Sequence, residues 1–197
     1  MTATDTFRHL ANRQTPSHHR CMKHALLSLA LTTLPVCATA QTSSAPPQIT
    51  VTQGIFCEIV SVATMDAPGT AAGQIELYDH TPEFQWLGST VPTVPGLSFG
   101  VRVDTQGGLS FGGTVITLTH PPLTGTDITE QSYVTTLGGE GPSVNAYTFD
   151  LPQEMVTGTW TFTAQQNGRE LYKVQFDVVP PSQVPQIALG CEGNLLS

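Results

Sequence analysis

The chain has 197 residues, with 7 basic and 15 acidic side chains and a formal net charge of −8 at neutral pH. An acidic surface repels phosphate backbones and anionic lipids, so binding to nucleic acid or to acidic membrane surfaces is disfavoured. Removal of residues 1–40 would make the net charge more negative. The remaining chain would have 3 basic and 14 acidic residues, a net charge of −11.

The first 40 residues carry the features of an export signal. Residues 1–21 are polar and patternless, and we interpret them as an over-extended start or a long n-region. Residues 22–40 predict a signal peptide, in which basic Lys23 precedes an apolar run and Ala38-Thr39-Ala40 fits a cleavage site. The apolar run of 12 residues is short of the about 20 that a membrane-spanning helix needs. We therefore predict a periplasmic or secreted protein, cleaved after Ala40 and without a transmembrane anchor after processing.

The remaining 157 residues are enough for one domain with a substantial core. We expect a flexible lead-in over 41–48, a folded domain over 49–179 and a C-terminal tail over 180–197. Short strands separated by Gly and Pro turns favour an all-β fold, an antiparallel Ig-like β-sandwich of about 7–9 strands. No amphipathic helix is expected. The expected strands cover 49–51, 54–62, 74–78, 84–87, 97–103, 114–119, 133–137 and 146–150, and loops are expected over 65–73 and 106–113.

The most regular segment, residues 158–179, predicts a β-hairpin. Apolar residues alternate with polar ones on both sides of Asn167-Gly168. Both turn residues accept the positive φ that a type I′ turn requires. The side chains predicted to face the core are Trp160, Phe162, Val174, Phe176 and Val178.

Two of the four cysteines remain after cleavage. Cys57 lies near the start of the domain and Cys191 lies near the end of the chain. An even number of cysteines in an exported protein predicts a disulfide. This bond would tie the tail to the first strands and stabilise the fold by about 4–5 kcal/mol in the chain-entropy model.

The sequence indicates no catalytic residue and no cofactor. Two Gly-x-Ser-x-Gly strings contain Ser98 and Ser110, but a hydrolase elbow needs a strand-to-helix turn and neither string opens a helix. Carboxylate pairs such as Asp150 and Glu154 would suit glycoside hydrolysis only if a cleft separated them correctly.

Metal binding is a weaker hypothesis that involves the two histidines of the mature chain. His80 is close in sequence to Asp79 and Glu83, and such sets can bind metal or move protons. Because the spacing does not require His80 and His120 to meet, we predict no metal site and keep these four residues as weak candidates.

Three aromatic residues outside the hairpin are candidates for core packing or for binding. Trp86 lies in a short acidic segment and is a candidate for an exposed contact. Tyr133 and Tyr147 remain open between core packing and binding.

A series of motifs runs through residues 49–179. In order, they are Gly54-Ile55-Phe56, His120-Pro121-Pro122-Leu123, Tyr147-Thr148-Phe149-Asp150, Gly158-Thr159-Trp160-Thr161-Phe162 and Gly168-Arg169. Together they resemble an uncharacterised bacterial family of unknown function. The resemblance implies a small bacterial domain that is often exported, and it carries no activity.

These observations predict a non-enzymatic binding or interaction module of the cell envelope, whose protein or glycan partner and oligomeric state are unknown. One alternative is a small periplasmic hydrolase or metal-dependent enzyme that uses His80, His120 and nearby carboxylates. Another alternative is a structural subunit of an envelope assembly. A pocket where histidine and carboxylate converge would indicate the enzyme, whereas a flat face or free sheet edge would indicate the module.

Overall fold

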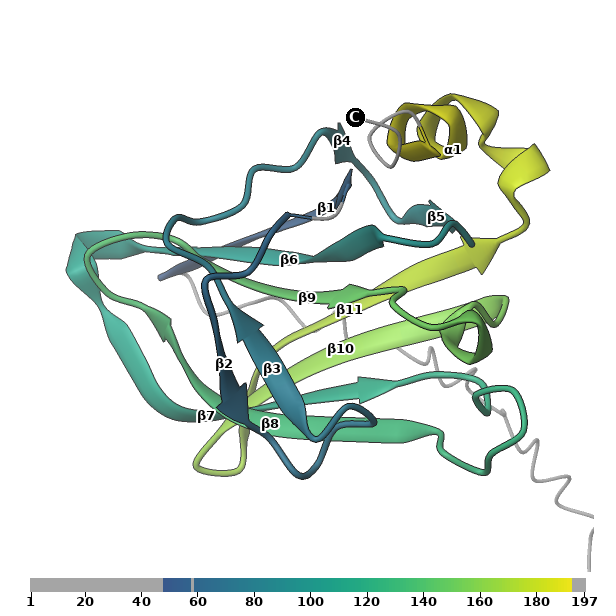
Figure 1. The fold of residues 1–197 in the computed structure, drawn as a ribbon. Helices are drawn as coiled ribbons and strands as arrows, with labels where there is room; N and C mark the ends of the chain where they lie inside the picture. The colour runs from purple at the N-terminus through teal and green to yellow at the C-terminus, as the bar shows by residue number, and fades with distance from the viewer. Residues whose placement is uncertain (1–47, 58, 193–197) are drawn as a thin grey trace, which may run out of the picture. The chain divides into compact units, whose positions relative to one another are not determined.

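A computed structural model describes residues 48–57 and 59–192, which form a β-sandwich followed by a short helix (Figure 1). The predicted signal peptide, the residues before it, most of the lead-in and the last five residues of the tail lie outside the described residues. Within the described ranges, no helix has the length and apolar character needed to cross a membrane.

The first sheet has four antiparallel strands in the order β4-β1-β6-β9. Its strands are β1 (Ile49–Cys57), β4 (Trp86–Leu87), β6 (Leu97–Thr105) and β9 (Ser143–Thr148). Strand β6 has the strictest alternation, and the side chains of Leu97, Phe99, Val101 and Val103 are fully buried. This alternation is what the sequence predicts for the segment.

The second sheet has five strands in the order β5-β11-β10-β7-β8. Its strands are β5 (Thr90–Pro92), β7 (Ser110–Thr119), β8 (Glu130–Gly138), β10 (Gly158–Gln166) and β11 (Arg169–Val179). All pairs are antiparallel except β5 with β11. The predicted all-β sandwich is confirmed, but the described chain has eleven strands where about 7–9 were expected. The strands that the sequence did not indicate are β2 (Ala63–Asp66) and β5, of four and three residues, which are too short to show a periodic pattern.

Phe99 joins the two sheets at the centre of the core. Its ring, on β6, lies edge-on to Trp160, Phe162 and Phe176 of the second sheet, with ring centroids 5.6, 6.0 and 5.2 Å away. Edge-to-face contacts at such distances stabilise a core beyond the area they bury. Of the five side chains expected in the core, Val174 is half-buried and the others are buried.

The β10–β11 hairpin turns at Asn167 and Gly168. Their φ angles are 51° and 76°, and Gln166 pairs with Arg169 across the two-residue loop. Positive φ at both central positions is the geometry of a type I′ turn, whose twist matches that of the flanking strands.

Two segments that were expected to be loops are partly strand. Residues 65–73 begin within β2 (Ala63–Asp66), which is exposed along its whole length and so lacks the alternation of a half-buried strand. Residues 106–113 include the start of β7, where the ladder is interrupted between Phe111 and Thr114. A bulge of this kind accommodates the consecutive glycines Gly112 and Gly113 inside a strand.

Within residues 48–57 and 59–192, strand β2 pairs only with β3 (Gln74–Leu77), and we call residues 63–77 the strap. Figure 1 shows β2 and β3 crossing in front of the sandwich, over the side where β8 and β9 lie. The tip of the strap is docked on β8, because Ser132 N donates to the Gly69 carbonyl at 2.8 Å and Ala71 N donates to Gln131 Oε1 at 2.7 Å. Gly69 approaches so closely that a Cβ atom there would clash with the Ser132 carbonyl oxygen.

The tail forms a 3-10 turn (η3, Pro181–Gln183) and the helix α1 (Pro185–Glu192), although no amphipathic helix was expected. A helix of eight residues is unstable alone in water, so its sequence gives little signal. It is stabilised by burial of Ile187 and Ala188 and by the predicted Cys57–Cys191 disulfide, which is confirmed. The two Cα atoms are 5.2 Å apart, and both cysteines are buried.

Loss of this disulfide should destabilise the whole domain. The bond spans a sequence separation of 134 residues, for which the chain-entropy model gives about 5 kcal/mol. We expect the Cys57→Ala/Cys191→Ala double variant to lose about this much free energy of unfolding in urea titrations. Intact mass should rise by two hydrogens when the denatured wild type is reduced. An unchanged mass, or a variant as stable as the wild type, would contradict the assignment.

Replacement of Gly69 by valine should lift the tip of the strap. The new Cβ would meet the Ser132 carbonyl oxygen and break the bonds that dock the tip. We expect the amide hydrogens of Ala71 and Ser132 to exchange roughly tenfold faster, because each lost bond contributes about 1 kcal/mol. Gly141→Val is the matched control, since open space surrounds that position. Unchanged exchange in Gly69→Val would show that these contacts do not hold the strap.

Candidate functional site: the pocket beneath the strap

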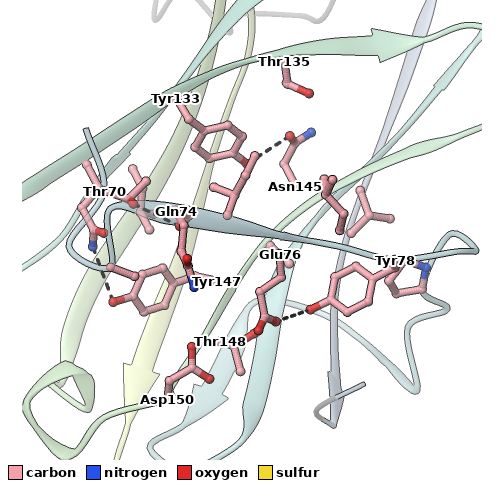
Figure 2. A pocket seen from close by; sticks show the side chains of 18 of the residues that line it. Thr70, Gln74, Glu76, Tyr78, Tyr133, Thr135, Asn145, Tyr147, Thr148 and Asp150 are labelled. Carbon is pink, nitrogen blue, oxygen red and sulfur yellow. Dashed lines mark hydrogen bonds between the residues drawn. The ribbon is translucent and has the colours of Figure 1, made fainter. Parts of the chain in front are cut away.

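A pocket of about 220 Å³ lies between the strap and the edge strands β8 and β9 (Figure 2). Strand β8 contributes the alternate residues Gln131, Tyr133 and Thr135 to its lining, and the edge strand β9 contributes the consecutive residues 144–148, which include Asn145 and Tyr147. The other polar or charged residues of the lining include Thr70, Gln74, Glu76, Tyr78, Asp150 and Glu154. The pocket is therefore formed by one surface of the sandwich and by the strap that covers it, each from a different part of the chain.

Tyr147 connects the pocket to the rigid core. Its ring packs against Trp160 with centroids 5.0 Å apart and against Phe99 at 6.2 Å. Burial raises the pKa of Tyr147, and a hydrogen bond from Gln131 only partly opposes this shift. The hydroxyl therefore stays protonated and neutral in any ordinary buffer, as a fixed polar group on an aromatic wall.

Tyr133 and Asn145 bridge the two sheets across their open side. The hydroxyl of Tyr133 donates to Asn145 Oδ1 at 3.1 Å, as the dashed line in Figure 2 marks. Burial raises the pKa of Tyr133, so this hydroxyl also remains a neutral donor. Since β8 and β9 belong to different sheets, this bond fixes the spacing of the two strands beneath the strap.

The buried amide of Asn145 also interacts with Tyr172 of β11. Burial raises the pKa of Tyr172, and a side-chain hydrogen bond with Asn145 partly opposes this shift. Within 3.5 Å, the Nδ2 atom of Asn145 and the hydroxyl of Tyr172 have no closer partner among the described residues. The Asn145 side chain is only 4% exposed, so it belongs to the interior between the two sheets.

Glu154 is a buried carboxylate with its hydrogen bonds already made. It follows β9 in the 3-10 turn η2 (Pro152–Glu154), and its Oε2 atom accepts from the backbone N–H groups of Asp150 and Leu151, both at 2.9 Å. Two charge-assisted bonds compensate the burial of the charge. This carboxylate shapes the loop after β9 and adds negative charge at the base of the pocket.

His120 lies behind the pocket in a fully bonded state. Its Nδ1 donates to the Pro121 carbonyl at 2.7 Å, its Nε2 accepts from Gln131 Nε2 at 3.1 Å, and its ring stacks on Trp160 at 4.5 Å. Burial lowers the pKa of His120, while the Pro121 carbonyl and the charge of Glu154 act in the opposite direction. The imidazole ring of His120 is therefore neutral and is held in one orientation by these contacts.

Gln131 transmits this orientation to the strap. Its amide nitrogen faces His120 and its Oε1 accepts the backbone N–H of Ala71 at 2.7 Å. The histidine that the sequence marked as a weak metal candidate therefore positions the cover of the pocket.

The mouth of the pocket is acidic. Tyr78, just after β3, donates its hydroxyl to Glu76 Oε2 at 2.9 Å, and Ser61 donates to the other oxygen at 3.4 Å. Asp150, at the end of β9, is exposed and lines the pocket from the opposite element. Every ionised side chain that the described residues contribute to the lining is a carboxylate.

The other candidate residues lie outside this pocket. His80 is exposed and paired with Asp79, so it shares no hydrogen-bond partner with His120 in the described part of the chain. Glu83 is exposed, and within residues 48–57 and 59–192 no three His, Cys, Asp or Glu residues gather as metal ligands would. Trp86 is half-buried and packs against α1 at Gly190.

The two serines of the Gly-x-Ser-x-Gly strings are in strands. Ser98 is buried on β6 and shares a hydrogen bond of 2.8 Å with Thr148, while Ser110 is exposed at the start of β7. Neither stands at a strand-to-helix turn, which is the geometry of a serine nucleophile in a hydrolase elbow.

The pocket was not predicted, although one sequence signal for it exists. Gln131 and Tyr133 alternate on β8, as do Asn145 and Tyr147 on β9, so polar or amphipathic side chains occupy positions that face inward. A sheet that only packs would place aliphatic residues there. The cover could not be read from the same pattern, because the strap touches β8 through contacts distant in sequence.

Removal of the His120 imidazole should flatten the pH dependence of stability. A histidine whose pKa is lowered by folding takes up its proton more readily when unfolded, so stability is complete above the ordinary pKa of 6.5 and is lost as pH falls below it. We expect the free energy of unfolding of the wild type to fall more steeply from pH 7 to pH 5 than that of His120→Gln, by at most about 1.4 kcal/mol per pH unit. Parallel curves for wild type and His120→Gln would contradict this assignment.

Comparison with known proteins supports the resemblance drawn from the motifs. No curated protein matches the chain. Among solved structures, an immunoglobulin-like protein from Pseudomonas aeruginosa is 22% identical, with 66% of this chain and 92% of that chain covered and a TM-score of 0.47. A family model described as a domain of unknown function, DUF3859, matches residues 45–178. The chain therefore belongs to the DUF3859 family.

Proposed function

We propose that this protein is a non-enzymatic, exported binding module that takes up a small ligand in the pocket beneath the strap. The observation that carries the proposal is the lining of the pocket. Tyr133 and Tyr147 line the pocket, and their hydroxyl groups are held in place by hydrogen bonds and by the aromatic core. Binding sites commonly combine aromatic walls with a few fixed polar groups.

The chemistry of the pocket supports binding over catalysis. A general base needs a lone pair or charge that can reach a substrate. His120 uses both ring nitrogens for hydrogen bonds within the protein, and Glu154 accepts two backbone N–H groups. These groups are arranged to hold the strap and the loop after β9.

Export is supported by the sulfur chemistry of the domain. Disulfides persist in oxidising compartments, and the buried Cys57–Cys191 bond joins β1 to α1. Together with the apolar segment and cleavage motif before Gln41, this bond favours a periplasmic or secreted location.

Ligand uptake can be tested by NMR with a library of small fragments. We expect a subset to shift the backbone resonances of the strap, β8 and β9 in the wild type. The Ala146→Phe variant adds a ring to a side chain of the lining and should abolish these shifts. Thr159→Phe is the matched control, because Thr159 is exposed on β10 and outside the lining.

Far-UV circular dichroism should show that both variants retain the fold. Fragments that shift only residues remote from the strap, or that bind Ala146→Phe as well as the wild type, would contradict the pocket as the binding site.

A further inference from the structure

We propose that the pocket is selective for a small organic cation, a molecule that carries a protonated amine or a quaternary ammonium group. This inference rests on the proposed function, because it assigns a ligand class to the same site. Its basis is the charge of the lining, the chemistry of its aromatic walls and the free volume.

The charge of the lining has one sign. Three carboxylates contribute to it: Glu76 from the strap, Asp150 from the end of β9 and Glu154 from η2. Figure 2 shows Glu76 and Asp150 projecting into the pocket from these separate elements. No basic residue of the described chain lines the pocket, so a cationic ligand would meet attraction from several directions and an anion would meet repulsion.

The basic residues of the described chain lie outside the lining. The mature chain contains three basic residues, Arg102, Arg169 and Lys173. Arg102 pairs with Asp104 at 3.2 Å, and the other two lie on β11, outside the lining.

The aromatic walls suit a cation for a second reason. The negative face of a tyrosine ring attracts an ammonium group that lies within about 6 Å of its centre. Tyr78, Tyr133 and Tyr147 all line the pocket, and burial raises the pKa of Tyr133 and Tyr147, so both rings stay neutral. Neutral rings beside carboxylates accommodate an alkylated ammonium better than a strongly hydrated inorganic ion.

A metal ion fits the same residues poorly. Calcium requires six or more oxygen ligands around one point. No cluster of three carboxylates, histidines or cysteines is found among the described residues. The volume of about 220 Å³ exceeds the about 150 Å³ of an engineered cavity that binds benzene, so the pocket has room for a small organic molecule.

The decisive comparison is between two probes of the same shape. Choline and 3,3-dimethyl-1-butanol differ only in the replacement of the quaternary nitrogen by carbon. We expect isothermal titration calorimetry to show choline binding at least tenfold more tightly than its neutral isostere. The preference should weaken as salt is added, because the carboxylates at the mouth are exposed.

The charge of the mouth can be removed without a change of shape. The Glu76→Gln/Asp150→Asn double variant should lower the affinity for choline at least tenfold and leave that for 3,3-dimethyl-1-butanol unchanged. Asp177→Asn is the matched control, since Asp177 is exposed on β11 and outside the lining. Its affinity for choline should equal that of the wild type.

The comparison of the two probes tests the ligand class, and the Ala146→Phe variant tests the binding site. Equal affinity for the two probes, or binding of neither, overturns the cation assignment, and the fragment experiment still decides whether the pocket binds. Choline binding that survives in Ala146→Phe places the cation elsewhere and overturns the assignment to this pocket. Tighter binding of choline that is lost in the double variant and in Ala146→Phe supports both proposals.

Discussion

The edge-on packing of Phe99 against Trp160, Phe162 and Phe176 is the contact on which the rest of the structure depends. This packing fixes the distance between the sheets. It also holds the Trp160 ring in place for contacts with two further rings. Tyr147 lies against Trp160 on one side, and His120 stacks on the same indole. The wall of the pocket is thus a continuation of the hydrophobic core, and its polar atoms have the positional precision of core side chains.

The side chain of Gln131 connects this core to the strap through hydrogen bonds. Gln131 has its amide nitrogen toward His120 and its oxygen toward Ala71, so both ends of the amide are specified. The arrangement requires His120 to accept at Nε2, which the neutral ring does because its other nitrogen donates to the Pro121 carbonyl. Burial favours this neutral state. The docking of the cover is therefore linked to the protonation state of a core histidine.

The fold could largely be predicted from the sequence, and the pocket could not. The β10–β11 hairpin and β6 have strict alternation, and Asn167-Gly168 identifies the turn, so local rules were sufficient. The pocket depends on the pairing of Tyr133 with Asn145 and on the strap, which are relations between segments that no local pattern specifies. Strand β2 and helix α1 were missed for a related reason. One is exposed throughout, and the other is short and stabilised by tertiary contacts.

The Cys57–Cys191 bond makes most of the domain a closed ring of chain, since it links the end of β1 to α1. The strap lies inside this ring. A protease that cut the exposed strap once would therefore leave both products covalently joined, with the two sheets still assembled around Phe99. Such a ring would therefore keep the two sheets assembled and covalently linked after a single cut in the cover of the pocket.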